Sequence, residues 1–499
     1  MTAIVYAEET LRTNEPVVLL AIDDRSLPWQ RGVYLDMRPP VKHPDNPVLE
    51  RGREGACDFW RAGQPSVLHE DGRWRMWYVA RHQMYGHDQI HIAYAQSHDG
   101  VHWEKPELGL RELNGNSRNN LVDCAPGLNS CTVIRDPDAP PDRRYVMVGE
   151  DMTDWVEWGH RAPSITRIDV SADGLHWCKI TDSTSFAQVF EAATVYKFNG
   201  RYHIGGHQIG DVMRLPMQTE PLGGYLGPRT FVISRSPQLE RWPDELVKGC
   251  FKPMCSSSPY RVGWDREELH VGAEVRPYGN VCVGVCGLWH HPINDGDPVY
   301  DSKLVSVDLG LLVSNDGLHF REPAPGYVFM GRDQELSWDR DWRDNTSEDN
   351  LLLMQGNVLN TDDETFFYYG ASSPGGNVFE VSHNTGLARM PRDRFGCLRL
   401  IPGAPAGQCA SCALTLDGAA VLSVNADVPA GSRLQVSLLD EDGLDALPGY
   451  GNDDGGHVME SGLDTTVVWG ETTTLPTGRP FRIRAEVEGA TELFALYIR

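Results

Sequence analysis

Ser97-His-Asp-Gly-Val-His-Trp103 is the stretch that decides the fold of this chain, because it recurs as Ser171-Ala-Asp-Gly-Leu-His-Trp177 and as Ser314-Asn-Asp-Gly-Leu-His-Phe320. A degenerate copy, Ser234-Arg-Ser-Pro-Gln-Leu-Glu-Arg-Trp242, lies between the second and the third. Each full copy follows an alternating apolar run, such as residues 90–96, which is typical of a half-buried strand. Asp-Gly then favours a tight turn, since Asp bonds its own backbone and Gly tolerates a positive φ. The phrase therefore predicts a strand-turn-strand corner that is repeated along the chain.

A second hairpin accompanies each corner. The hairpins are read at residues 68–78, 132–148, 195–203, 275–283 and 357–369. Two hairpins per repeat make a four-stranded antiparallel unit, which is typical of a β-propeller blade. The sequence therefore predicts an all-β chain with a five-bladed β-propeller. Its blades are expected at residues 58–108, 119–182, 187–246, 250–323 and 335–395. An array of β-sandwiches without a central channel is the alternative.

The chain is long enough for two domains, at 499 residues. No lysine occurs after residue 400, the stretches 434–439 and 481–487 alternate in polarity, and turn clusters such as 451–456 separate them. This pattern predicts a C-terminal antiparallel β-sandwich. We expect residues 1–395 to form the propeller, with an N-terminal wrapping segment, as the catalytic or ligand-binding domain. Residues 396–499 are expected to form the accessory β-sandwich.

Charge and composition exclude several classes of function. The net charge of −25 argues against nucleic acid as a partner, because phosphate backbones require a basic face. No stretch approaches the roughly 20 apolar residues of a membrane span, and the N-terminal residues lack the pattern of a secretion signal, so we expect a cytoplasmic protein without a membrane partner.

The eleven cysteines fit reduced thiols. Cys409-Ala-Ser-Cys412 has a redox or half-zinc spacing but stands alone, so neither a metal nor a cofactor is expected.

Carboxylates recur where the innermost strands of the blades are expected to begin. They are Asp58, Glu191, either Glu268 or Glu274, and Asp349. In a propeller these strands surround the axis, so that a ligand meets side chains from several blades. Carboxylates from opposing walls are what glycosidic cleavage requires: one is protonated and assists the leaving oxygen, and the other activates water or attacks carbon. Such residues also accept backbone N–H bonds from turns, which is the structural alternative.

Further polar and aromatic side chains near the expected channel mouth are candidate substrate contacts. They are Trp60, Arg61, Gln64, Arg135, His207, Trp264, His270 and Gln355. The tryptophans are suited to stacking on sugar faces, and the others to hydrogen bonding with hydroxyl groups. The histidines of the repeated phrase, His102, His176 and His319, are expected to be packing and turn residues on separate blades.

Four stretches give the chain a resemblance to a known group of proteins. They are Arg75-Met-Trp-Tyr78, the phrase from Ser97 to Leu110, Ile134-Arg-Asp-Pro137 and Phe198-Asn-Gly-Arg-Tyr202. Over most of residues 15–400 the chain resembles the bacterial proteins similar to glycoside hydrolase families 32 and 43. The resemblance implies a five-bladed propeller, often followed by a β-sandwich. It also implies three acids from the first three blades, acting as nucleophile or base, transition-state stabiliser and general acid.

The three acids that the resemblance implies match this chain to different degrees. It implies that Glu191 is the general acid and that Asp136, in Arg135-Asp136-Pro137, is the stabiliser. By its hairpin position Asp136 also ends a strand and opens a turn, so a turn residue is the alternative. The first-blade position holds Gln64 instead of an acid, so either Asp58 substitutes or the nucleophile is absent.

These observations lead to three hypotheses about function. The first is a glycosidase acting on a furanoside, such as a fructofuranoside or an arabinofuranoside, in an oligosaccharide or glycoconjugate, with Glu191 as general acid and Asp58 or Glu274 as its partner. The second is a carbohydrate-binding propeller without catalysis, which Gln64 motivates. The third is glycosyl transfer to an acceptor other than water, including phosphate, for which arginines near the acids would supply positive charge. Those arginines are Arg61, Arg135, Arg266 and Arg276.

Overall fold

The part of the chain that the structure describes consists almost entirely of β-sheets, in which most strand pairs are antiparallel. A computed structural model describes residues 1–6, 9–83, 90–152, 165–182, 191–209, 229–243, 247–251, 268–290, 306–332, 352–354, 356–373 and 382–499. These residues form strands, turns and short 3₁₀ helices such as Pro141–Arg143 and Asn452–Asp454, so the prediction of an all-β chain is confirmed. Within the described ranges, no helix is both long and apolar enough to cross a membrane.

Each of the five stretches expected to form a blade contains antiparallel strands in chain order. The first contains β7 (Arg61–Glu70), β8 (Arg73–Arg81) and β9 (Ile90–Ser97). The second contains β10 (Thr132–Arg135), β11 (Tyr145–Asp151), β12 (Ile165–Ser171) and β13 (Cys178–Asp182). The third contains β14 (Glu191–Phe198), β15 (Arg201–Ile209), β16 (Arg229–Ser236) and β17 (Val247–Phe251). The fourth contains β18 (Glu268–Tyr278), β19 (Val281–His290) and β20 (Ser306–Ser314). The fifth contains β21 (Leu352–Met354), β22 (Val358–Asn360), β23 (Glu364–Ser373) and β24 (Ser382–Pro391), with β6 (Val41–Lys42) added at β24.

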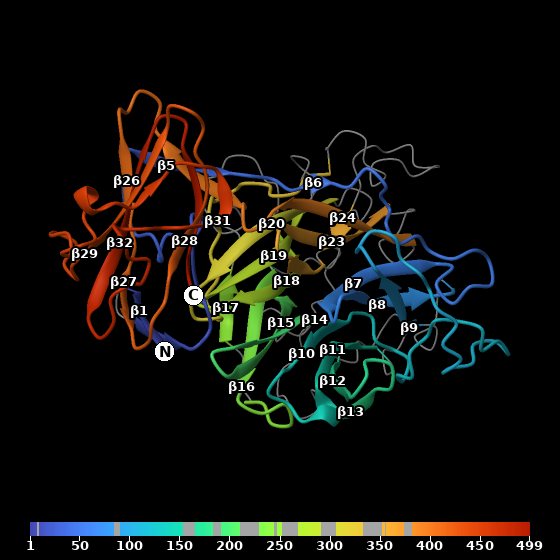
Figure 1. Ribbon diagram of the computed structural model, residues 1–499. Helices are drawn as coiled ribbons and strands as arrows, with labels where there is room; N and C mark the ends of the chain where they lie inside the picture. Colours follow the sequence, from blue (N-terminus) through green and yellow to red (C-terminus); the bar gives the residue numbers. More distant parts are fainter. Residues whose placement is uncertain are drawn as a thin grey trace, which may run out of the picture.

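The five units meet through strands near the start of each. Strand β7 contacts β10, β10 contacts β14, β14 contacts β18, β18 contacts β22, and β22 contacts β7, which closes a cycle of five. In Figure 1, β7, β10, β14 and β18 converge around one centre, whereas β9, β13 and β16 lie farther out. We call β7, β10, β14, β18 and β22 the innermost strands. Residues at equal heights on these strands are therefore brought together although they are far apart in the sequence.

The repeated phrase forms the same corner in three units. The Asp side chain of each copy accepts the backbone N–H of the histidine three residues later, at 2.8 Å for Asp99, 2.9 Å for Asp173 and 2.8 Å for Asp316. The preceding serine hydroxyl accepts the N–H of the glycine, as Ser171 does from Gly174 at 2.8 Å. This confirms the predicted turn, in which Asp bonds its own backbone. The three histidines are exposed and each contacts the aspartate of its own corner, in agreement with a role in the turn.

Replacement of Gly174 by alanine is expected to destabilise the protein more than replacement of Gly200. Both glycines have a positive φ, +79° and +70°, so that alanine is strained at either position by about 1 kcal/mol. A Cβ at Gly174 would also lie 2.6 Å from the ring of Trp77 and 2.8 Å from Arg75, whereas a Cβ at Gly200 meets nothing within 4 Å. We expect losses of about 3 kcal/mol for Gly174→Ala and about 1 kcal/mol for Gly200→Ala, measured by urea unfolding. Equal losses would contradict the close packing of this corner.

Two further antiparallel sheets are built from both ends of the chain. The larger contains β1 (Thr2–Tyr6), β2 (Glu9–Thr13), β4 (Trp29–Arg31), β26 (Gly407–Ala410), β27 (Ala413–Leu416), β29 (Arg433–Leu439), β30 (His457–Val458) and β32 (Pro480–Glu488). The smaller contains β3 (Val17–Leu20), β5 (Val33–Met37), β25 (Gly396–Leu400), β28 (Leu422–Asp427), β31 (Gly462–Thr466) and β33 (Glu492–Ile498). Strand β32 alternates buried and half-buried residues, as its sequence predicts.

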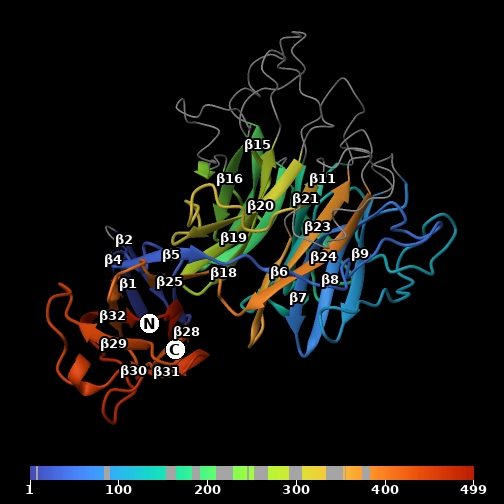
Figure 2. The same cartoon turned by 90° about the horizontal axis from the view of Figure 1, so that it is seen from above.

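The N-terminal strands complete these two sheets. Strand β1 pairs with β27, β4 with β26, β5 with β25 and β3 with β33, although the sequence grouped residues 1–395 together. Both ends of the chain lie in this part of the molecule (Figure 2). Apolar side chains of both sheets join one buried cluster, which Phe198 and Phe231 of the third unit also enter. The two ends of the chain are thus held together and packed against the units that carry the innermost strands.

Candidate functional site

The innermost strands share a layer of polar residues at their common centre. It consists of Ser66, Thr132, Thr194, Glu274 and Asn357, each followed by a buried valine. We call these five residues the polar layer. Three of them accept the backbone N–H of a valine on another innermost strand: Ser66 from Val133 at 2.8 Å, Thr194 from Val275 at 3.1 Å, and Asn357 from Val67. The polar layer therefore lies at the same height on all five strands.

Glu274 is the one ionisable member of the polar layer, and its carboxyl contacts two other innermost strands. Its Oε2 accepts a hydrogen bond from Thr132 Oγ1 of β10 at 3.1 Å, and the hydroxyl of Thr194 on β14, which accepts the backbone N–H of Val275, lies near enough to lower the pKa of the carboxyl. Arg276 Nη2 lies 3.2 Å from Oε1. Burial raises the pKa of Glu274 to about 7, because it outweighs the opposing effects of Arg276 and the two hydroxyls. Such a carboxyl can hold or release a proton near neutral pH.

This pKa predicts that the stability contributed by Glu274 falls as pH rises. Between pH 4.5, its ordinary pKa, and about 7, the folded protein retains a proton that the unfolded chain has released, so unfolding becomes easier with rising pH. The full effect is about 3 kcal/mol, and it is absent in Glu274→Gln, which cannot titrate. We expect the free energy of unfolding of Glu274→Gln, relative to wild type, to increase between pH 5 and pH 8. A difference that does not change with pH would contradict the raised pKa.

Gln64 lies in a strained part of β7. Its φ is +51°, and the pairing of β7 with β8 is irregular between Gly63 and Ser66. A left-handed conformation is unfavourable for a residue with a side chain. Gln64 is buried, and its Oε1 has no hydrogen-bond partner among the described residues. A buried amide oxygen without a partner among the described residues calls for an explanation, and the role of Gln64 as a substrate contact stays a prediction.

Trp60 and Arg61 lie at the start of the same strand. Arg61 is buried and donates from Nη1 to Asn129 Oδ1 at 3.1 Å, and Arg81 Nη2 donates to the same oxygen at 2.9 Å. Asn129 in turn donates to Glu150 Oε2 at 3.1 Å. The backbone N–H of Trp60 donates to the carbonyl of Arg81, and its indole N–H is buried with no hydrogen-bond partner among the residues that the structure describes. Trp60, Arg61 and Gln64 therefore lie together at one end of β7, and their roles as substrate contacts stay predictions.

Strand register brings three further predicted residues to the same end of the innermost strands. Glu191 begins β14, three residues before Thr194, and pairs with His207 of β15. His270 lies on β18, four residues before Glu274. The side chains of these three residues lie outside what is described, as do Trp264 and Gln355 entirely. Their roles stay predictions.

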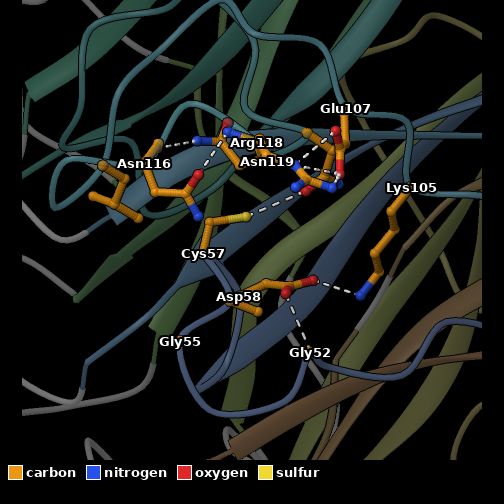
Figure 3. A pocket seen from close by; sticks show the side chains of 12 residues that line it. Gly52, Gly55, Cys57, Asp58, Lys105, Glu107, Asn116, Arg118 and Asn119 are labelled. Atoms are coloured by element: carbon orange, nitrogen blue, oxygen red, sulfur yellow. Dashed lines mark hydrogen bonds and ion pairs between the residues drawn. The ribbon is translucent and has the colours of Figure 1, made fainter.

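Asp58 lies in a separate pocket of about 240 Å³, formed by residues 52–58 and 105–120 (Figure 3). It is buried, its Oδ2 is 2.5 Å from Lys105 Nζ, and it accepts hydrogen bonds from the Tyr78 hydroxyl at 2.8 Å and the Gly52 N–H at 3.1 Å. Within the described part of the chain, no contact joins Asp58 to the polar layer. These bonds engage both carboxylate oxygens of Asp58. The structure therefore does not place Asp58 beside Glu274.

Asp136 and Arg135 lie at the opposite end of β10 from Asn129. The carboxylate of Asp136 accepts bonds from Lys197 Nζ at 2.7 Å, from the Tyr202 hydroxyl and from the N–H of Asp138 at 3.0 Å. Burial raises its pKa, but the bonds from Lys197 and Tyr202 outweigh burial and hold the pKa below its usual range. Arg135 is exposed, 3.6 Å from Glu70. The contacts of Asp136 and Arg135 are those of turn residues. The structure places neither of them beside Glu274.

Sequence reasoning gave no role to Thr132, Thr194, Arg81 or Asn129. A signal for the two threonines was present. A polar residue precedes a valine in or at the start of every innermost strand, as Ser66-Val67, Thr132-Val133, Thr194-Val195, Glu274-Val275 and Asn357-Val358, and β18 contains a second such pair, His270-Val271. Aligning the five strands on this pair would have placed Glu274 among small polar residues. No comparable pattern marks Arg81, because its partner Asn129 lies in another unit.

One group of potential metal ligands occurs in the described ranges, formed by Asp36, Cys397 and Glu492. Arg38 lies within 3.3 Å of Asp36 and also bonds Glu492, and Arg399 lies 3.1 Å from Asp36. These guanidinium groups neutralise the carboxylates. Neither this group nor the polar layer, with its single carboxylate, has the ligand set of a metal centre.

No protein-family model matches this chain, and no curated protein matches it. Among solved structures, a glycosyl hydrolase from Bacteroides ovatus is similar at 16% identity and a TM-score of 0.44, covering 72% of this chain and 95% of that chain. A structure of the GH130 family of mannoside phosphorylases, said to contain glycoside hydrolases that target β-1,2 mannosidic linkages in Candida mannan, is similar at 15% identity and a TM-score of 0.43, covering 72% and 95%. An N-acetylgalactosamine deacetylase from F. plautii, in complex with blood group B trisaccharide, is similar at 15% identity and a TM-score of 0.41, covering 72% and 96%. At TM-scores below 0.5 these similarities carry no argument about chemistry, and the resemblance to families 32 and 43 stays a prediction.

Proposed function

We propose that this protein is a glycosidase whose reaction takes place beside the polar layer. The observation that carries the proposal is Glu274: a buried carboxyl with a pKa of about 7 that accepts a hydrogen bond from Thr132 of another innermost strand. Glycosidic cleavage needs one carboxyl that is protonated near neutral pH and a second that is ionised. Glu274 has the properties of the first. Glu191, at the start of β14, is its proposed ionised partner, which reverses the role that the resemblance implied for Glu191.

The proposed architecture is a five-bladed β-propeller followed by a β-sandwich. The closed cycle of contacts among β7, β10, β14, β18 and β22 supports the propeller, since this is how the inner strands of blades are arranged. The two C-terminal sheets with a shared apolar cluster support the sandwich. In this arrangement the unpaired polar atoms of Trp60 and Gln64 would contact a sugar ring bound over Glu274. The proposed substrate is a furanoside in an oligosaccharide or glycoconjugate, cleaved in the cytoplasm.

A panel of aryl furanosides and aryl pyranosides tests the proposal. Release of the phenol by the purified protein, at a rate that depends on enzyme concentration, is the expected result. Proton NMR of the first sugar formed then gives the stereochemical outcome, which reports whether the two carboxyls lie about 5 Å apart, with retention, or about 6.5 to 9.5 Å apart, with inversion. Failure to release phenol from any substrate of the panel, by protein that binds sugars, would reject the proposal.

A second candidate function is carbohydrate binding without catalysis. Gln64 favours it, because an amide occupies the first-blade position where the resemblance implies an acid, and an amide can bind a hydroxyl but cannot act as a base. Calorimetric titration with the sugars of the same panel distinguishes the two functions. Sugar binding that does not change on replacing Glu274 by glutamine, together with no turnover, would favour a binding protein.

A further inference from the structure

Arg276 lies next to Glu274 on one face of β18. Residues 274–278 pair regularly with β19, so Glu274, Arg276 and Tyr278 point to the same face of the sheet. Arg276 Nη2 is 3.2 Å from Glu274 Oε1, and the two side chains are only 13% and 5% exposed, so the pair is largely shielded from water. Arg276 also lies near enough to Tyr278 to lower the pKa of its hydroxyl. The guanidinium group is therefore held between the carboxyl of the polar layer and the next side chain along the strand.

This position is on the side of Glu274 away from the proposed ligand. The ligand is proposed to bind at the end of the innermost strands marked by Trp60, just before β7, and by Glu191, the first residue of β14. Arg276 lies two residues farther from that end than Glu274, or about 7 Å along the strand at ~3.3 Å per residue. Arg276 can therefore affect the reaction of a bound sugar only through Glu274.

The contact between the two side chains is electrostatic. Glu274 Oε1 and Arg276 Nη2 are buried, and neither atom has a hydrogen-bond partner among the described residues. A positive charge at this distance favours the ionised carboxyl and opposes burial, which favours the neutral one. Without Arg276, burial would keep Glu274 protonated up to a higher pH. A carboxyl that retains its proton cannot act as a base.

Other titratable groups lie near Glu274 on neighbouring strands. The thiol of Cys131 on β10 is within electrostatic range of both Glu274 and Arg61 of β7, and burial raises the pKa of this thiol to about 12, so it is neutral near pH 7. The register partner of Glu274 on β19 is Val285, and the other members of the polar layer are uncharged. Toward the ligand end, the titratable residues whose side chains lie outside what is described are Glu191, His207, Glu268, His270 and His290.

We propose that Arg276 is a positioning residue for Glu274, which places a fixed positive charge beside the carboxyl on the side away from the ligand. The inference rests on the proposed function, in which Glu274 gives a proton to the leaving oxygen and, if configuration is retained, then takes one from water. A carboxyl that does both must change its charge near the pH at which the enzyme works. Arg276 supplies the charge that makes this change possible in a buried layer.

The test follows the protonation of Glu274 against pH by infrared difference spectroscopy. The signal is the C=O stretch of a protonated carboxyl that is present in wild type and absent in Glu274→Gln. In Arg276→Met we expect this signal to persist to a pH at least about 1 unit higher than in wild type, because an adjacent opposite charge shifts a carboxyl by about 1 to 3 units. Arg276→Lys keeps the charge and should titrate close to wild type. The control Arg392→Met removes a guanidinium 3.8 Å from another buried carboxyl, that of Asp393, and should leave the Glu274 signal unchanged.

The outcomes separate this inference from the proposed function. An unchanged titration in Arg276→Met, or an equal shift in Arg392→Met, overturns the inference. If Arg276→Met does not fold, Arg276→Gln takes its place, and an unchanged titration there overturns it equally. The spectra require no turnover, so a protein without glycosidase activity still gives a result.

Activity supplies a second measurement. The alkaline limb of the pH profile of kcat should move by the same amount as the spectra in Arg276→Met, with KM within about 3-fold of wild type because Arg276 does not touch the substrate. A spectral shift without movement of this limb would support the action of Arg276 on Glu274 and reject Glu274 as the acid of the proposed function.

Discussion

Glu274→Gln is expected to lower kcat/KM on glycosides with poor leaving groups at least 1,000-fold, because general acid catalysis contributes about 10²- to 10⁴-fold and an amide cannot supply the proton. Glutamine retains the shape of the side chain and an oxygen that can accept the Thr132 hydrogen bond, so the fold should persist. Substrates that release a dinitrophenolate do not need protonation of the leaving oxygen, and we expect the loss on these to be less than 10-fold. The measurement is steady-state kinetics on both kinds of substrate.

The matched control for this variant is Asp393→Asn. Asp393 is also a buried carboxyl whose pKa is raised by burial, but it bonds Asn360 and Tyr497 instead of the polar layer. Its replacement should change stability and leave kcat/KM within a few-fold of wild type. In wild type, activity should fall as pH rises through about 7, where Glu274 loses its proton. A variant Glu274→Gln that keeps a tenth of wild-type activity on the poor leaving groups would remove Glu274 from the chemistry.

Glu191→Gln is expected to abolish turnover on every substrate while leaving sugar binding largely intact. If Glu191 is the ionised partner, its loss removes the nucleophile or the base, and a better leaving group cannot compensate. We expect kcat to fall at least 10⁴-fold on both kinds of substrate, with dissociation constants within about 5-fold of wild type. The contrast with Glu274→Gln, which responds to the leaving group, separates the two roles.

Glu364→Gln supplies the control for this substitution. Glu364 lies at the start of β23, half-exposed and 3.1 Å from Arg389, outside the innermost strands. The variant Glu364→Gln has the same change from carboxyl to amide as Glu191→Gln, and it should retain full activity. Full activity in Glu191→Gln would eliminate the assignment. A loss of activity with dinitrophenyl substrates fully restored would instead return the general acid role to Glu191, as the resemblance implied.

Local features of the fold could be predicted from the sequence because their causes are local. The Asp-Gly corners follow from a side chain that bonds the next few backbone amides, and the structure contains these bonds in all three full copies. The alternation of β32 follows from burial of one face. Pairing between distant segments has no such local cause. Nothing in Thr2–Tyr6 indicates that its partner is β27, so this pairing could not be predicted from the sequence.

The same distinction between local causes and long-range contacts applies to the candidate site. Gln64 was named because it occupies the first-blade position that the resemblance implies, but its positive φ lies at an irregularity in strand pairing that no local sequence pattern marks. Asp58 also precedes β7, yet its carboxylate pairs with Lys105, a residue from the connection to the next unit. Glu274 could be named as a carboxylate near the axis, whereas its raised pKa depends on burial by the surrounding strands, which outweighs the effects of Arg276 and the nearby hydroxyls. Long-range contacts, and not residue type, therefore decide which acid can exchange a proton.

Strands from both ends of the chain pair with each other in the C-terminal sheets, and this pairing affects how the protein folds. Strands β26, β27 and β25 each lie beside a strand from residues 1–37, and until those meet they present open hydrogen-bonding edges. Residues 1–37 are synthesised long before their partners in residues 396–416, so these sheets depend on pairing across a long sequence separation, which is slow to nucleate. For the same reason the C-terminal hundred residues are not a detachable module, and a stable fragment would have to carry both ends, joined by a new linker.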